Sequence, residues 1–340
     1  MSAWREAQLL GLGPLASQKG RGQFMSNDDD HDFSDSDENG EIVTEEMLWE
    51  RIPQTSGLER ANTFYELSAR IYARGQYDEA LALAESARDI YAELNPVLSS
   101  DGLAQAYSAI GYNLNQLKRN SEAATAMSKA VEILRETKSP LAIDLACTLG
   151  EWWYGSKNYE QAIECMRECV QEHLIEGNEG GAANDLHLIG CAYRELNLHE
   201  QSLLAFQEAR ALFKGLKEVI NVARCDQKIA HALIELGDSE SALIAAQKSL
   251  DVFVTAHDHR RETYSLFELG RAQVLVGEEQ SGLDTLERVL EIATESEWKD
   301  FDFIVEIERC MAGVLRDIGR IDEADEIERR ISAITEVTED

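Results

Sequence analysis

Hydrophobic positions along most of the chain recur with the spacing of amphipathic helices. Apolar residues lie three or four positions apart, as in Phe64, Leu67 and Ile71. No segment sustains the every-second-residue alternation that a half-buried strand requires. Short polar turns such as "KRNS" separate the helical stretches, for example a first helix over 101–117 and a second over 121–136. The chain is therefore predicted to be all-α.

One short phrase returns seven times in this helical pattern. "GQYDEALAL" has relatives that include "KNYEQAIEC" and "GDSESALIA", and the copies are 39 to 43 residues apart. Each copy carries a small residue in its second helix and another small residue twelve positions earlier, in its first helix. We call these fourteen residues the anchors; they form the pairs Ser68/Ala80, Gly111/Ala123, Gly150/Ala162, Gly190/Ser202, Ala230/Ala242, Gly270/Gly282 and Ala312/Ala324. Helices that cross closely need small side chains at the crossing, so each pair predicts where the two helices of a repeat meet.

The repeats resemble those of the tetratricopeptide-repeat family over roughly residues 58–336. The family pattern consists of a bulky residue, Leu-Gly, an aromatic, then Gly-x-Tyr-x-x-Ala, another aromatic and a further Ala. Three copies supply most of the matching residues: Phe64, Leu67, Gly75, Tyr77, Ala80 and Ala87; Tyr107, Gly111, Ala123 and Ala130; and Gly190, Tyr193, Phe206 and Ala209. The resemblance implies a right-handed superhelical solenoid of about seven helix-turn-helix repeats that binds a protein or peptide in a concave groove.

The repeats depart from the family pattern in two respects. Their period is near 40 residues rather than 34, which is similar to the long-repeat subgroup of kinesin light chains, mitotic-spindle adaptors and bacterial peptide-sensing regulators. The last two copies place Gln273, Glu308 and Glu328 where apolar or aromatic residues are expected. We therefore expect the seventh copy to act as a polar cap that closes the array.

The N-terminal segment has a different composition. Residues 26–46 hold ten carboxylates and no Lys or Arg, so residues 1–43 are predicted to be disordered. A short capping helix and linker are expected at 44–57, followed by the repeat domain at 58–340. Met25, just before the acidic tract, is an alternative to Met1 as the true first residue.

Charge and hydropathy restrict the partners. The chain holds 32 basic and 64 acidic residues, a net charge of −32, which disfavours binding to nucleic acid or to an anionic membrane. No apolar run approaches the roughly 18 residues of a membrane span, and no signal-peptide pattern is found in the sequence. A cytoplasmic location is expected, and the sequence does not indicate an oligomeric state.

Neither catalysis nor a cofactor is predicted. The motifs GxSxG, GxxxxGK, HExxH and a GxGxxG that follows a strand are all missing. Cys165, Cys169 and His173 are spaced one helical turn apart and form a conceivable metal-ligand set. Core packing is the preferred interpretation of these residues, because Cys169 falls where the repeat needs a small side chain. We expect a non-enzyme without a bound metal.

The predicted binding residues come from a second stripe on each first helix. At 100° per residue, positions six and three before the anchor, and one and four after it, lie about 130° from the packing stripe. In the family this second stripe lines the concave groove. The binding residues predicted on it are Tyr65, Tyr72, Tyr112, Asn115, Tyr154, Asn184, His187, Arg194, Arg224, Gln227, His231, Tyr264 and Arg271.

The chemistry of this stripe favours a peptide ligand. Carboxamides can bond to both groups of a peptide unit, and tyrosines provide contact area at low entropic cost. Arg194, Arg224 and Arg271 are expected to cluster with Lys228 nearby, which suits an acidic ligand or a C-terminal carboxylate. The alternative is that these arginines pair with the acids of the protein itself.

Two functions follow from these predictions. The first is a non-catalytic scaffold or adaptor that holds a partner segment in the groove. The second is a peptide-responsive regulator whose repeat domain changes conformation on binding and switches the activity of a partner. A change in scattering radius on ligand addition distinguishes the regulator from the scaffold.

Overall fold

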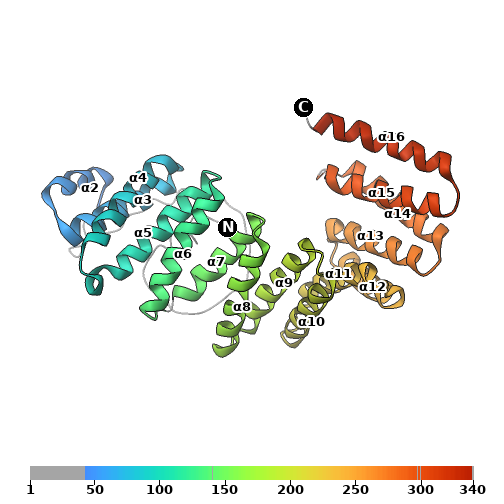
Figure 1. Cartoon of the computed structure of the whole chain (residues 1–340), viewed down its shortest axis with the longest axis horizontal. Helices are drawn as coiled ribbons and strands as arrows, with labels where there is room; N and C mark the ends of the chain where they lie inside the picture. The colour runs from blue at the N-terminus through green and yellow to red at the C-terminus, as the bar shows by residue number, and fades with distance from the viewer. Residues whose placement is uncertain (1–42, 140, 297, 299, 339–340) are drawn as a thin grey trace. The chain divides into compact units, whose positions relative to one another are not determined.

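The computed structural model describes residues 43–338 apart from 140, 297 and 299. Within these residues it contains fifteen α-helices, one 3-10 helix and no strand, which confirms the all-α prediction (Figure 1). The predicted disordered segment lies outside the described residues except for Val43. The chain divides into two compact units, Met1–Cys165 and Met166–Asp340, which we call the N-terminal unit and the C-terminal unit.

The N-terminal unit contains a short helical lead-in followed by the first helix pairs. Its elements are α2 (Glu45–Arg51), η1 (Ile52–Gln54), α3 (Gly57–Ala73), α4 (Tyr77–Glu93), α5 (Pro96–Gln116), α6 (Asn120–Glu136), α7 (Leu141–Gly155) and the start of α8 (Tyr159–Ile175). Each of α3 to α6 packs against the helix that follows it in sequence, and α3 also contacts α5.

The C-terminal unit begins within α8 and continues the same pattern. Its further helices are α9 (Glu179–Glu195), α10 (His199–Gly215), α11 (Val219–Glu235), α12 (Ser239–Thr255), α13 (His259–Leu275), α14 (Glu279–Glu295), α15 (Phe301–Asp317) and α16 (Ile321–Thr338). From α3 onward the odd-numbered helices are the first helices of seven consecutive pairs. Consecutive first helices also touch one another, since α11 contacts α13 and α13 contacts α15.

The anchors meet as the sequence predicts. Ser68 Oγ donates a hydrogen bond to the carbonyl oxygen of Ala80 at 2.7 Å, and Ser202 Oγ donates to the carbonyl of Gly190 at 2.9 Å. A Cβ atom at Gly270 would lie 3.3 Å from the carbonyl oxygen of Gly282. The crossing helices are therefore separated by little more than their own backbones, which explains why the anchors are Gly, Ala or Ser.

A residue in the left-handed region ends many of the helices and does so at intervals of about twenty residues. Glycine occupies some of these turns, as at Gly237 (φ 77°), whereas Lys217 (φ 61°) and His257 (φ 55°) occupy neighbouring ones. Around Gly237, the amide of Asp238 donates back to the carbonyl of Leu233 at 2.9 Å. The turn thereby satisfies backbone groups that the helix end leaves open.

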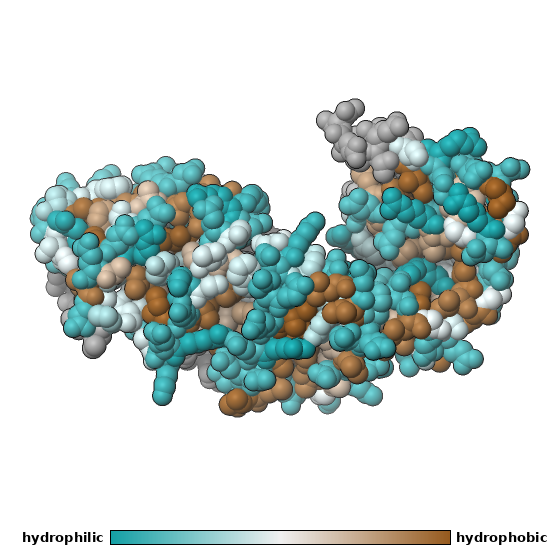
Figure 2. All heavy atoms as spheres, viewed as in Figure 1, coloured by the Kyte–Doolittle hydropathy of each residue, from teal (hydrophilic) through white to brown (hydrophobic). Residues whose placement is uncertain are grey.

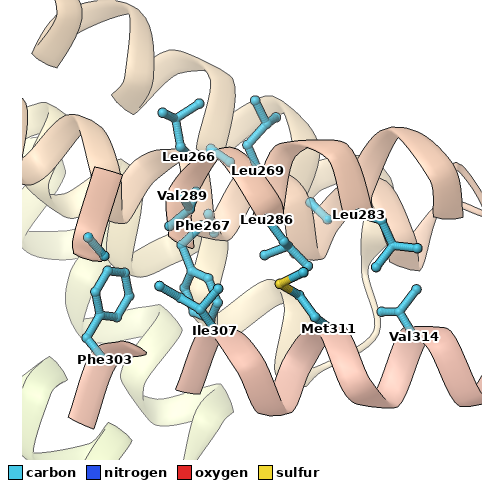
Figure 3. Close-up of a cluster of buried hydrophobic side chains, with 14 of the residues drawn as sticks. Leu266, Phe267, Leu269, Leu283, Leu286, Val289, Phe303, Ile307, Met311 and Val314 are labelled. Atoms are coloured by element: carbon cyan, nitrogen blue, oxygen red, sulfur yellow. The ribbon is translucent and has the colours of Figure 1, made fainter. Parts of the chain in front are cut away.

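A large core cluster of the C-terminal unit consists of aliphatic and aromatic side chains between the helices of successive pairs (Figure 3), and a smaller cluster lies around Phe213. Phe267 of α13 and Phe303 of α15 meet edge to face at 5.3 Å between ring centroids, and Ile307 and Leu286 are fully buried. Such packing of apolar area against the next pair stabilises each repeat, because one helix pair alone cannot bury its apolar face.

The lead-in helix α2 packs against α3. Of its three large apolar residues, Leu48 is fully buried, whereas Met47 and Trp49 are 38% and 44% exposed. The carbonyl oxygen of Val43 accepts a hydrogen bond from Arg70 at 2.6 Å. Only Leu48 therefore covers the first pair in the way expected of a capping helix.

The seventh pair is expected to be a polar cap, but one of its two acids at positions expected to be apolar is buried. Glu308 of α15 is 4% exposed; one of its carboxylate oxygens lies 3.4 Å from Arg330, and the other has no hydrogen-bond partner in the described part of the chain. Burial raises the pKa of Glu308, and Arg330 only partly opposes that effect. Glu328, by contrast, is exposed and pairs with Arg316 at 2.6 Å.

We expect Glu308→Leu to raise the free energy of unfolding by about 1–2 kcal/mol at pH 7.5, because it removes an imperfectly paired buried charge. A carboxyl whose pKa is higher in the folded chain than in the unfolded chain destabilises the fold when ionised. This penalty disappears as the pH falls through the folded pKa. The increase in unfolding free energy caused by Glu308→Leu should therefore become smaller as the pH is lowered from 7.5 to 4.5. Urea unfolding monitored by circular dichroism measures it. The matched variant Glu328→Leu should change stability little at either pH, and an equal gain from both variants would contradict the assignment.

Candidate functional site

The candidate site is the face shared by the first helices α9, α11 and α13 in the C-terminal unit. On each helix the predicted residues lie on one side, because steps of three and four residues return to the same face. His187 and Arg194 come from α9, Arg224 from α11, and Arg271 from α13.

Three cations converge on this face around His187. Burial, followed by the charges of Arg224, Lys228 and Arg194, lowers the pKa of His187 to about 3. The same three cations lower the pKa of Cys191, although burial raises it overall. We call Arg194, Arg224 and Lys228 the cationic cluster; a neutral imidazole lies among them at physiological pH.

The charges of the cationic cluster are only partly neutralised. Arg194 pairs with Glu195 at 2.5 Å. Arg224 donates to the amide oxygen of Asn221 at 2.9 Å, and among the described residues neither Arg224 nor Lys228 forms an ion pair. Burial lowers the pKa of Lys228, and the nearby Arg194 lowers it further. The cluster therefore carries positive charge that an anionic group could stabilise.

The two thiols beside the cluster are protonated. Cys225 Sγ lies 3.7 Å from His187 Nδ1, and burial raises the pKa of Cys225 to about 12. The His187 ring packs against Phe206 at 5.1 Å between ring centroids. Cys225 and His187 therefore act as packing residues whose pKa values are shifted, and they do not form a pair of a thiolate and a base.

Arg271 belongs to an ionic network that adjoins the cationic cluster, since the charges of Glu268 and Lys228 influence each other's pKa. Its guanidinium bonds to Glu268 at 3.1 Å and to Glu235, and His231 Nδ1 lies 3.0 Å from the other Glu268 oxygen. Burial alone would raise the pKa of Glu268, but the His231 hydrogen bond and the charges of His231 and Arg271 hold it below its usual value. We call these four residues the ionic network.

The structure therefore divides the predicted cluster of three arginines. Arg194 and Arg224 lie with Lys228 as expected, whereas Arg271 is compensated by two acids of the protein. Glu235 and Glu268 are absent from the sequence prediction. The position of Glu268 three residues before Arg271 on one helix is a signal that indicates the pairing.

The other predicted residues of this unit mostly join neighbouring first helices. Gln227 donates to Ser265 Oγ at 3.2 Å, and the Tyr264 hydroxyl donates to Asp300 at 3.1 Å. Asn184 is exposed on α9. Gln227 is buried and holds α11 against α13, so Asn184 is the more accessible carboxamide.

The predicted tyrosines of the N-terminal unit are largely buried. Tyr65, Tyr72 and Tyr112 are 7%, 6% and 2% exposed, and Asn115 and Tyr154 are half-buried. The Tyr72 hydroxyl accepts a hydrogen bond from Gln116 of the next first helix at 3.2 Å. The Tyr112 ring also meets Trp152 of the next first helix, edge to face at 5.3 Å between ring centroids. The angular position on an isolated helix does not reveal such contacts between consecutive first helices.

The cysteines and the histidine of the conceivable metal-ligand set make other contacts. Cys165 Sγ donates to the carbonyl of Ala146 at 3.2 Å, and Cys169 is fully buried. His173 Nδ1 lies 2.9 Å from Asp185. Core packing is thus seen for Cys169, and the expectation that this set holds no metal stays a prediction.

Seven helix pairs joined through small anchors define a helical-repeat protein. The family model for the tetratricopeptide repeat matches residues 60–96, and with the seven pairs it identifies the chain as a tetratricopeptide-repeat protein. This repeat is a general protein- and peptide-binding fold, which implies protein or peptide partners. A search of curated proteins finds no match. Within the described residues no helix is both long enough and apolar enough to cross a bilayer.

Three solved structures share the fold at low sequence identity. A signal transduction ATPase with numerous domains and a tetratricopeptide-repeat sensor, from Pyrococcus horikoshii, has a TM-score of 0.59 and 15% identity. That match covers 85% of this chain and 43% of the Pyrococcus chain, so this chain spans less than half of that protein's length. The apo form of RapI has a TM-score of 0.54 at 14% identity, covering 81% of this chain and 97% of its own. Aspartyl phosphate phosphatase F from Bacillus subtilis has a TM-score of 0.52 at 14% identity, covering 81% and 71%.

Proposed function

We propose that the chain is a non-catalytic scaffold that binds an acidic peptide segment, or one ending in a carboxylate, on the face formed by α9 and α11. The single observation that carries this proposal is the cationic cluster. Arg224 and Lys228 have no ion-pair partner in the described residues, although the chain as a whole has a net charge of −32. Hydrogen bonds from such cations to a carboxylate are stronger than those between neutral groups.

The titration of neighbouring groups supports binding rather than catalysis. A general acid or base works best with a pKa close to the operating pH. The pKa of His187 is about 3 and that of Cys225 about 12, so neither group exchanges a proton readily near neutrality. Asn184 is exposed on α9, the helix that carries His187, and a carboxamide can bond with the backbone of a peptide.

The test compares two double variants for binding of a fluorescein-labelled decapeptide of Asp, Glu and Gly with a free C-terminal carboxylate. In fluorescence anisotropy, Arg224→Gln/Lys228→Gln should weaken binding about 100-fold, because it removes two charge-assisted contacts. The matched variant Lys214→Gln/Lys217→Gln removes the same charge from exposed lysines of the same unit. It should retain affinity within about threefold.

Arg271 is left intact in this experiment because its loss would disturb the ionic network rather than the ligand site. A version of the peptide with a C-terminal amide separates recognition of the terminal carboxylate from recognition of acidic side chains. Equal weakening by both double variants would show that only net charge matters. Unchanged binding by the first variant would refute the proposal.

A further inference from the structure

A hollow lies in the C-terminal unit between α8, α9 and α10, and none of its lining residues belongs to the cationic cluster. Its cavity volume is about 400 Å³, within the range of sites that hold small ligands or single side chains. The walls are mostly apolar and the rim is polar; the lining residues are Arg167, Val170, Gln171, Leu186, Ile189, Tyr193, Gln201, Leu204, Ala205 and Glu208.

The next repeat shows how this hollow can be closed. Forty residues after Val170 and Leu186, the equivalent positions hold Arg210 and Asp226. Those two side chains form an ion pair at 2.8 Å, and Asp226 is buried. The repeat that carries the cavity has apolar side chains at both positions and no such ion pair across them, so an unfilled apolar wall remains.

Apolar surface continues beyond the mouth of the cavity. Leu204 lines the cavity and is 59% exposed, and Ile244, at the equivalent position of the next second helix, is 55% exposed. Figure 2 shows hydrophobic patches between the hydrophilic residues that cover most of the visible surface of this unit. A ligand confined to the cavity would leave Leu204 largely in water, whereas a longer apolar partner would cover it.

The two charged residues at the rim, Arg167 and Glu208, differ in their contacts within the protein. The Arg167 guanidinium donates to the Tyr193 hydroxyl and lies 5.8 Å from the centre of its ring. Glu208 lines the cavity and, in the part of the chain that the structure describes, forms no ion pair. Arg167 keeps its charge but is directed onto Tyr193, whereas Glu208 is a carboxylate that a cation on the ligand can pair with.

We infer that this cavity is a second binding site, which receives one large apolar side chain from a basic segment of a protein partner. The apolar side chain lies against Val170, Leu186 and Ile189, and a lysine or arginine beside it pairs with Glu208. Leu204 and Ile244 are covered by further apolar residues of the same segment. The site does not depend on the cationic cluster. It fits a basic segment, whereas the cationic cluster fits an acidic one.

The experiment uses the full chain and a fluorescein-labelled sixteen-residue amphipathic peptide of leucine, lysine and one tryptophan. Leu204→Glu should weaken binding at least about tenfold, since it replaces apolar contact with charge at an exposed position that the fold does not need. Glu208→Lys should weaken binding several-fold and make it less sensitive to salt. The matched control Leu236→Glu changes another exposed leucine of the unit and should leave affinity unchanged.

Two further arms distinguish the cavity from the cationic cluster and from a pocket for a small molecule. The Arg224→Gln/Lys228→Gln variant should bind the lysine peptide like the parent, whereas the same peptide with glutamate for lysine should lose affinity at the cavity. Equal effects of Leu204→Glu and Leu236→Glu, or no binding of the lysine peptide, would overturn the inference. If 2-phenylethylamine binds as tightly as the peptide and its binding is lost in Leu204→Glu, the site takes a small cation and the protein partner is refuted.

Discussion

Replacing Arg271 with alanine is expected to lower the free energy of unfolding by about 3 kcal/mol. The substitution removes the guanidinium between Glu235 and Glu268 and leaves the Glu268 carboxylate, 8% exposed, with His231 as its remaining partner in the ionic network. An unpaired buried charge costs more than the pair contributes, because its hydration is lost without compensation. Urea unfolding followed by circular dichroism measures the change.

Arg316→Ala is the matched control for this prediction. Arg316 also pairs with two acids, Asp325 and Glu328, but its side chain is 43% exposed. Its loss should cost less than about 1 kcal/mol, since water can replace the exposed partners. Adding Glu268→Leu to Arg271→Ala should recover part of the lost stability. Similar losses from Arg271→Ala and Arg316→Ala would contradict the ionic network as a buried element.

Gly190→Leu is expected to cost about 3 kcal/mol of unfolding free energy through overpacking at an anchor. A Cβ atom at Gly190 would lie 2.8 Å from the ring of Phe206, which is fully buried. The Ser202 hydroxyl also bonds to the Gly190 carbonyl, so the helices cannot separate without losing that hydrogen bond. Thermal and urea unfolding of the variant measure the effect.

Gly313→Leu provides a control with the opposite expected sign. Gly313 lies within α15, and a Cβ atom there meets nothing within 4 Å. Leucine at this position should stabilise the chain by roughly 0.5–1 kcal/mol, because glycine is a poor helix former. If both leucine variants destabilise the chain to the same extent, the small size of the anchors would not be the reason for their recurrence.

The helix pairs could be predicted from the sequence because their determinants are local. Two anchors twelve residues apart are joined by one tight turn, so their contact depends only on the helical period and the turn between them. The bond between Ser68 and Ala80 is the direct outcome of that geometry. The end of the first helix follows for the same reason, since the tight turn between the two anchors holds a residue with positive φ, such as Gly237 between Ala230 and Ala242.

The candidate site could be predicted only in part because it depends on contacts between repeats. The helical angle places Tyr112 and Gln227 on the inner side, but it does not say that both side chains are buried. Whether Arg271 is available depends on Glu235, which belongs to another repeat. The cavity beside Val170 becomes visible in sequence only when two repeats are compared position by position with Arg210 and Asp226.

Most contacts in each unit join helices that are adjacent in sequence. Contacts between segments that are close in sequence cost little chain entropy when they form. Folding can therefore begin in any helix pair and spread to its neighbours. A substitution in one pair should then lower the local opening energy of that pair and its neighbours more than that of distant pairs. One helix pair can therefore change during evolution while the remaining pairs keep their own stability.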